Sequence, residues 1–110
     1  MTLADPPGKP GRPDIPNWDK DFVDVEWKPP KDDGGAPIEK YIIQMRDKET
    51  RNWEDCMTVP GERNIARVTA VQEGHEYDFR IVAVNKAGKS EPSDPSKSVV
   101  AKPRFCKFLS

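Results

Sequence analysis

The tripeptide Gly88-Lys89-Ser90 is the residue pattern that ends the phosphate-binding loop of many nucleotide hydrolases. That loop needs an earlier glycine, five residues before Gly88, because its backbone must wrap closely around a phosphate. Ala83 occupies this position, and prolines follow at Pro92 and Pro95 where a phosphate loop would be followed by a helix. The sequence therefore predicts a hairpin turn with Gly88 at a positive φ, and no nucleotide site.

Side chains suited to acid–base or metal chemistry are present but are not grouped by the sequence. The single histidine, His75, lies in a predicted turn, where we expect a surface residue rather than a general base or a metal ligand. A β-sandwich of this size, the fold predicted below, fills its core with its own side chains and leaves no substrate cavity. We therefore expect no enzyme activity, no metal site and no cofactor. The carboxylates fall in turns and on outward strand positions, where solvated surface is the default: Asp32, Asp33, Glu49, Glu54, Asp55, Glu73 and Glu76.

The overall composition limits the partners that the chain could bind. Its 110 residues are about one domain, and its net charge of -1 provides no field to attract nucleic acid or an acidic membrane. No apolar run approaches the roughly 18 residues of a membrane span, and the first residues do not resemble a signal peptide. Cys56 and Cys106 could form a disulfide, but two free thiols fit the sparse cysteine content better. With no Asn-x-Ser/Thr acceptor, a reducing compartment is favoured.

Short strands separated by turn residues account for most of the chain. The clearest is residues 21–27, where Val23, Val25 and Trp27 alternate with carboxylates at the period of a strand exposed on one face. In residues 76–85, Tyr77 and Phe79 share one face, while the opposite face also looks partly covered. The remaining strands are expected near Ile15 and at residues 38–46, 53–59, 64–71 and 98–102.

Seven strands without an amphipathic helix predict an all-β, antiparallel β-sandwich. Prolines and glycines crowd residues 5–16, which argues for an extended linker or edge segment. We divide the chain into residues 1–9 as linker, 10–103 as the domain and 104–110 as a tail or the start of the next linker. An immunoglobulin domain would carry a cysteine in each of two central strands, and neither expected strand has one.

The inward Trp27 and the tyrosine that opens the sixth strand together resemble a fibronectin type III domain, an immunoglobulin-like seven-stranded sandwich. The resemblance covers most of the chain and runs through residues 25–30, 33–38, 41–43 and 73–80. In that family the tyrosine forms a corner, with its hydroxyl bonded to backbone a few residues upstream. Here that role falls to Tyr77, and Val71 stands where leucine is usual. The resemblance implies these core residues: Trp27, Tyr41, Val71, Tyr77 and Phe79.

Two stretches, residues 33–41 and 84–93, are similar to the modules of giant intracellular muscle proteins. These are the titin, twitchin and projectin group and the myosin-binding proteins, with twitchin or projectin favoured partly on residues 18–22. The resemblance implies a non-catalytic module in the cytoplasm, in the A-band of the sarcomere. It also implies neighbouring immunoglobulin and fibronectin type III domains, contact with the myosin thick filament, and a parent chain that can carry a protein kinase domain.

Surface residues with a possible binding role are few. Trp18 lies close to the N-terminal linker in sequence and could pack on a neighbouring domain, because aromatic anchors are enriched at interfaces. The favoured interpretation is that it lies flat on its own sheet edge, covered by long neighbouring side chains. Lys86, Lys89 and Glu91 form a charged loop that could contact a partner. We expect the isolated domain to be monomeric. The alternative function is an extracellular adhesion or receptor module of the same fold that binds a cell-surface protein.

Overall fold

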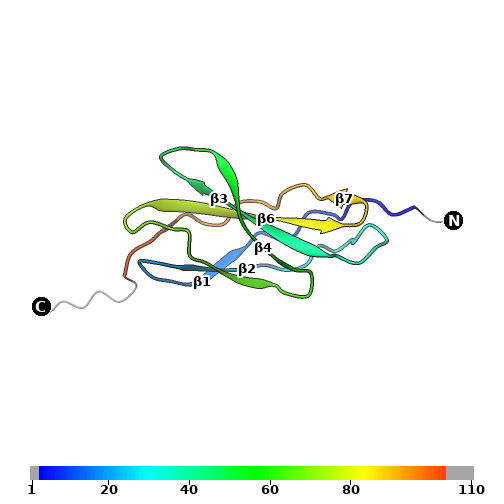
Figure 1. The fold of residues 1–110 in the computed structure, drawn as a ribbon, viewed down its shortest axis with the longest axis horizontal. Helices are drawn as coiled ribbons and strands as arrows, with labels where there is room; N and C mark the ends of the chain where they lie inside the picture. Colours follow the sequence, from blue (N-terminus) through cyan, green and yellow to red (C-terminus); the bar gives the residue numbers. More distant parts are fainter. Residues whose placement is uncertain (1–2, 104–110) are drawn as a thin grey trace, which may run out of the picture.

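The alternation around Val23 produces the central strand of the first sheet. In the computed structural model, which describes residues 3–103, Val23 and Val25 are fully buried while the carboxylates between and after them are not. This strand pairs antiparallel on both sides, in the order β1 (Asp14–Trp18), β2 (Val23–Glu26) and β5 (Ile65–Val68). Figure 1 shows this sheet as one layer of a sandwich, and none of the described residues forms a helix that could cross a membrane.

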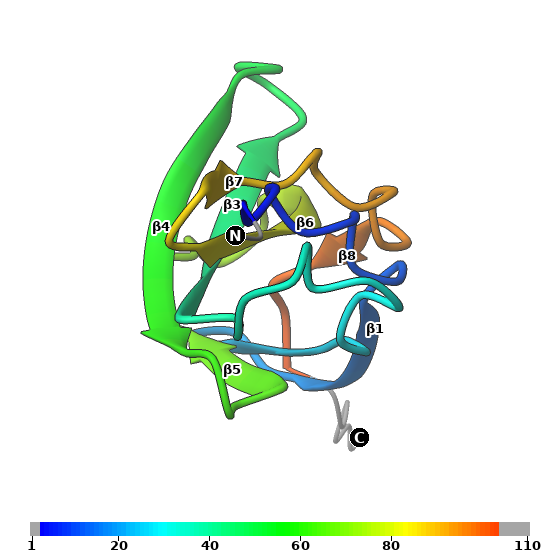
Figure 2. The same ribbon diagram turned by 90° about the vertical axis from the view of Figure 1, so that its right-hand side faces the viewer.

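The second sheet is larger and is centred on the two longest inner strands. β3 (Lys40–Asp47) pairs with β4 (Trp53–Pro60) on one side and with β6 (Glu76–Asn85) on the other. Two short strands, β7 (Gly88–Lys89) and β8 (Val99–Val100), pair with the opposite edge of β6. Figure 2 looks along the module from its N-terminal end and shows the two layers facing each other. The antiparallel β-sandwich expected from the sequence is confirmed.

The core lies between the inward faces of the two sheets. Trp27 is 2% exposed, and its ring meets that of Tyr41 edge to face at a centroid distance of 5.3 Å. From β6, the period of two directs alternate side chains inward, and these are fully or almost fully buried: Tyr77, Phe79, Ile81 and Ala83. The opposite face of the same strand carries Val82 and Val84, which form a second small buried cluster with Ile42. Both faces of β6 are therefore covered.

The fifth strand is shorter than expected, and different residues of it point into the core. Residues 64–71 were expected to form it, with Ile65, Val68 and Val71 as its apolar residues, but only Ile65–Val68 pair with β2. Ala66 and Val68 are the buried residues, whereas Ile65 is 40% exposed. Apolar and polar residues do not alternate regularly in this stretch, so the sequence did not show which of its residues point into the core.

The last edge of the second sheet is not one regular strand. Between β7 and β8, the backbone N–H groups of Ser90, Ser93 and Ser96 donate to carbonyl groups of β6, two residues apart on that strand. Each serine hydroxyl also accepts a hydrogen bond from a β6 amide at 2.9–3.1 Å. The repeat of three residues is that of a polyproline II helix and accommodates Pro92 and Pro95, which could not donate to a regular ladder.

Candidate interaction site

The Gly88-Lys89-Ser90 stretch consists of β7 and the residue after it, and follows the two-residue turn that ends β6. The side chain of Asn85 accepts hydrogen bonds from the amides of Ala87 and Gly88, at 2.8 and 3.2 Å, and Gly88 has a φ of 142°. The amide of Ser90 donates to Ala83. These amides are the groups that would have to bind a phosphate, and all are already used within the hairpin. The turn expected from the sequence is present.

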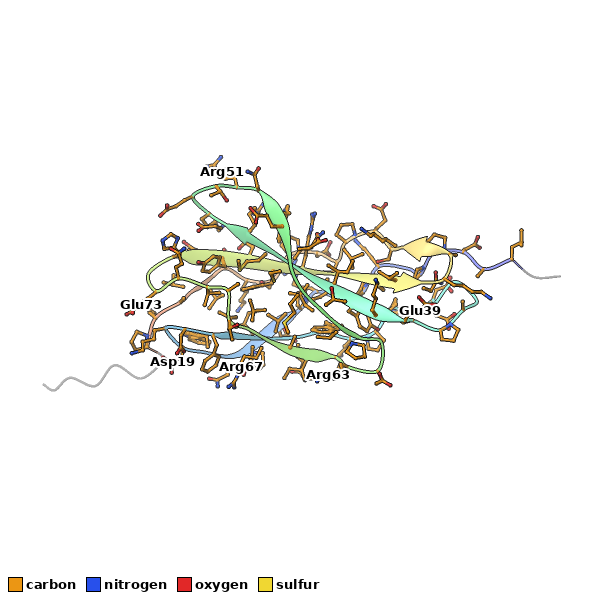
Figure 3. The ribbon with its side chains drawn as sticks, in the orientation of Figure 1. Asp19, Glu39, Arg51, Arg63, Arg67 and Glu73 are labelled. Carbon is orange, nitrogen blue, oxygen red and sulfur yellow. The ribbon has the colours of Figure 1, made fainter. Side chains whose placement is uncertain are left out.

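The four residues proposed from the sequence as a contact surface do not lie together. Lys86, Lys89 and Glu91 are exposed around the β6–β7 turn, at the same end as the N-terminus (Figure 1). Trp18 is only partly exposed and packs against the core. It precedes Asp19, which Figure 3 places at the opposite end of the module, where the described chain ends. Trp18 therefore does not lie beside the N-terminal linker, as its sequence position had suggested.

Trp18 lines a groove between the free edges of the two sheets. The groove has a volume of about 660 Å³ and also contacts Ile15 of β1, Val100 of β8 and Lys102. Its position follows from the topology, because β1 and β8 are the outermost strands of their sheets on this side. The sandwich thus has one open side, with an aromatic residue in its wall.

The segment of residues 5–11, called the N-terminal strap below, is hydrogen-bonded to the domain. The amide of Asp5 donates to the carbonyl of Gly34 and that of Gly8 to the carbonyl of Asp32, both at 2.8 Å. Pro7 and Pro10 are buried. Most of this strap falls in the region that the sequence suggested was a linker, so the folded unit extends further toward the N-terminus than the expected boundary at residue 10.

Asn85 and Gly34 hold the strap in place. Asn85 is 2% exposed, and its amino group donates to the carbonyls of Asp5 at 2.8 Å and Asp33 at 2.7 Å. A Cβ atom at Gly34 would lie 1.9 Å from the carbonyl oxygen of Asp5, and the φ of Gly34 is 77°. Only glycine allows this close approach. One buried amide side chain thus joins three segments: the strap, the loop before β3 and the β6–β7 turn.

His75 lies at the opposite end and forms an ion pair. Its Nδ1 is 2.8 Å from the carboxylate of Asp47, and its ring stacks against Tyr77. The hydrogen bond to Asp47 raises the pKa of His75. The pKa of Asp47 is lowered, first by the hydrogen bond from the amide of Glu49 and then by His75. The histidine therefore titrates as part of a pair.

Potential metal ligands surround His75, which the sequence had not suggested. Ligand atoms of Asp47, Glu49 and His75 lie within 4.8 Å of one another. Both carboxylate oxygens of Asp47 already accept hydrogen bonds, from His75 and from the Glu49 amide. The geometry is therefore accounted for by the ion pair and by a turn, without a metal ion.

Trp53 and two arginines form the most distinctive cluster on the outer face of the second sheet. The guanidinium carbons of Arg46 and Arg80 lie 4.6 and 4.3 Å from the centroid of the Trp53 ring. Strand register brings them together, because Arg46 of β3 pairs with Trp53 of β4, while Arg80 of β6 pairs with Gln44 of β3. Sequence analysis missed this cluster, because it could not align the strands.

Asp78 is a buried carboxylate beside this cluster. It accepts hydrogen bonds from Arg46 at 2.7 Å and from the Ser98 hydroxyl at 2.6 Å, and Lys48 lies 3.4 Å away. Burial acts to raise the pKa of Asp78, but hydrogen bonds from Ser98 and Arg46 and the charge of Lys48 outweigh it, so the pKa is lowered. The charge of Arg46 is thereby neutralised inside the module.

The core residues implied by the family resemblance differ in how their polar atoms are satisfied. The Tyr77 hydroxyl accepts a hydrogen bond from the Gln72 amide at 2.7 Å, one residue after Val71. Val71 itself is only partly buried and packs at the margin of the core. Trp27 Nε1 and the Tyr41 hydroxyl are buried without a hydrogen-bond partner among the described residues.

Cys56 is a free thiol that is poorly suited to redox chemistry. Its Sγ donates to the carbonyl of Ile43 at 3.2 Å, and burial raises its pKa to about 12. The thiolate, which is the reactive form, is therefore scarce at neutral pH. Cys106 and the rest of the tail lie outside the described residues.

Comparison with known proteins places this geometry in a family. The family model for the fibronectin type III domain matches residues 8–99. Human myomesin-2 is 41% identical over 74% of this chain, and human cardiac-type myosin-binding protein C is 34% identical over 88% of it. The chain corresponds to 6% and 8% of their respective lengths.

Solved structures agree with these matches. The kinase region of twitchin from Caenorhabditis elegans aligns with a TM-score of 0.84 and 31% identity, covering 94% of this chain and 18% of that one. Titin from Drosophila melanogaster is also 33% identical over 93% of this chain, so twitchin or projectin is not singled out among the muscle proteins. The chain belongs to the fibronectin type III domain family, and it is similar to modules of muscle proteins such as myomesin-2, titin and twitchin.

Proposed function

We propose that this module sets the spacing and direction between neighbouring immunoglobulin and fibronectin type III domains of a sarcomeric protein, and that it contributes to association with the myosin thick filament. The family is a non-catalytic structural and interaction module. The chain spans less than a tenth of the curated relatives' length, so the neighbours belong to the parent protein. We place that protein in the cytoplasm, in the A-band, and expect the isolated module to be a monomer.

The N-terminal strap is the observation that supports the spacing role. A flexible linker would let a preceding domain swing, whereas residues held by hydrogen bonds to Gly34 and Asp32 leave the module in a defined direction. Asn85 secures the strap from a buried position. Direction is therefore controlled by the module itself rather than by the composition of the linker.

Two neighbouring glycines provide a matched test. Gly34 and Gly35 both have a positive φ, of 77° and 89°, but only a Cβ at Gly34 would collide with the strap. With a globular domain fused before Met1, Gly34→Ala should release the strap and broaden the range of interdomain distances measured by small-angle X-ray scattering. Gly35→Ala carries the same backbone strain and should leave that range unchanged. Equal broadening in both variants, or in neither, would contradict the spacing role.

Filament association is tested separately by co-sedimentation with myosin filaments. The proposal is supported by the muscle relatives, of which one is named as a myosin-binding protein. We expect the module, alone or in tandem with its neighbours, to sediment with filaments above a control with albumin. If neither form sediments, the filament part of the proposal is wrong while the spacing role stands.

A further inference from the structure

Two arginine–aromatic contacts on opposite sheets differ in how their charge is balanced. On the first sheet, the guanidinium of Arg67 lies 4.0 Å from the Phe22 ring centroid and is neutralised by two hydrogen bonds to Asp24, at 2.9 and 3.3 Å. On the second sheet, the guanidinium of Arg80 lies over Trp53. Its Nε donates at 2.6 Å to the side-chain oxygen of Gln44, which is neutral.

Arg80 has no carboxylate partner within the described part of the chain. The ion pairs in residues 3–103 include Arg46 with Asp78 on this face, but none involves Arg80. The exposed carboxylate of Asp55 instead accepts a hydrogen bond from the amino group of Gln44 at 2.8 Å. Burial lowers the pKa of Arg80, and the adjacent charge of Arg46 lowers it further. The module thus holds a partly buried cation beside a second cation.

The unused donors of Arg80 define what would complement it. A guanidinium has five N–H donors in a planar fork, and only the Nε–H of Arg80 is bonded to the described residues. The contact with Trp53 restricts the plane of the group, so less freedom is lost when a ligand binds. A carboxylate fits the two terminal N–H groups in a bidentate arrangement.

We propose that Arg80, Trp53 and Arg46 form a docking site for an acidic segment of a protein partner, with an aspartate or glutamate side chain bound by Arg80. The partner is a polypeptide rather than a polyanion, because the exposed Glu54 and Asp55 follow Trp53 on β4 and would repel a dense row of phosphates. This inference deepens the proposed contact with a protein partner by assigning it a face and a charge.

The test is a titration of the ¹⁵N-labelled 110-residue chain with a synthetic peptide of glycine and serine that carries one glutamate. A peptide with glutamine in place of glutamate is the control. We expect shifts at the Arg80 Nε–Hε and Trp53 indole signals, and none at Arg67, whose charge is already balanced. Equal shifts with the glutamine peptide, or shifts confined to other residues, would overturn the proposal.

Matched charge variants complete the test. Arg80→Gln should lower the affinity for the glutamate peptide by about fivefold, which is the upper end of the effect of a solvent-accessible ion pair. Arg63→Gln removes one exposed arginine from another part of the surface and should change affinity less than about twofold. Equal losses in the two variants would contradict the site. The wild-type shift map decides the matter if Arg80→Gln does not fold.

Other sources of negative charge serve as further outcomes. Phosphatidylserine vesicles or inorganic phosphate binding Arg80 more tightly than the peptide would overturn the choice of a polypeptide partner. Peptide binding and co-sedimentation with myosin filaments test the two proposals separately. If the peptide does not bind but the module sediments with myosin, the docking site is wrong and the proposed function stands. If the peptide binds but the module does not sediment with myosin, the docking site stands and the filament part of the proposed function is wrong.

Discussion

The two ends of the module are fixed by different kinds of interaction. At the N-terminal end, neutral hydrogen bonds from the buried Asn85 hold the strap, and Gly34 allows its close approach. At the opposite end, the Tyr77 hydroxyl holds the Gln72 amide, and the Asp47–His75 ion pair lies partly exposed beside it. Buried neutral bonds persist across pH and salt, whereas an exposed ion pair responds to both. The His75 ion pair should therefore make the second end more sensitive to pH and salt than the first.

The core that both ends share gives the largest expected effect. Trp27 is 2% exposed and belongs to the same apolar cluster as Tyr77. Trp27→Ala should lower the free energy of unfolding by about 3–5 kcal/mol, because it leaves a large cavity. Urea denaturation measures the loss, and hydrogen exchange should accelerate at both ends alike. A loss below about 1 kcal/mol would show that Trp27 is not a central residue of the core.

Asn85→Ala should loosen the N-terminal end selectively. The change strands the carbonyls of Asp5 and Asp33 and two amides in the turn, which should cost about 3 kcal/mol in urea denaturation. Asn85→Asp is the sharper variant, since it retains the oxygen that accepts from the turn but loses the amino group that holds the strap. We expect rapid amide exchange in the strap of both variants. Protection of the strap equal to wild type in Asn85→Asp would contradict the anchoring role.

Comparing two buried tyrosines isolates the contribution of the Tyr77 hydroxyl to stability at the end of the module that carries His75. Tyr77→Phe removes the acceptor of the Gln72 amide and should cost about 1–2 kcal/mol, at the lower part of the usual range because Gln72 is exposed. Tyr41→Phe removes a hydroxyl without a partner and should be neutral or slightly stabilising. Thermal unfolding of both variants compares them directly. Equal destabilisation would mean that the hydrogen bond from Gln72 does not account for the cost of removing the Tyr77 hydroxyl.

The smallest expected effect is a pH dependence confined to the same end. The pKa of His75 is raised above its ordinary value of 6.5, so its contribution to stability is complete below that value and is lost as the pH rises through the folded pKa. The pKa of Asp47 is lowered from 3.8, so its contribution is lost as the pH falls through the lowered value. The melting temperature should decline slightly from pH 6 to pH 8. This decline should disappear in His75→Gln and persist in Asn85→Ala, which adds no titratable group.

Local patterns were sufficient to predict the fold. Strand β6 was predicted with the same bounds that the structure shows, because its inward apolar residues recur at every second position and turn residues flank them. The last strand was predicted at residues 98–102, where β8 lies, but the paired segment before it was missed. Its Ser-x-Pro repeat pairs with β6 at a period of three, which neither the strand nor the helix pattern detects.

Contacts between distant residues could not be predicted. Asn85 bonds to residues 80 and 52 positions away, and no local pattern indicates that one amide will meet both. The Arg46, Trp53 and Arg80 cluster likewise depends on the register of three strands. Only this register brings the three side chains into one site.

The central claim, that the module fixes the direction of the chain that enters it, is tested most directly by ¹⁵N relaxation. The amides of Asp5, Gly8 and Gly11 donate to the domain and report on the strap. We expect their order parameters to be about 0.85, the value of a rigid backbone and the same as in β3 and β6. Values below about 0.6 at these amides, with the sheets rigid, would show a flexible linker and contradict the account.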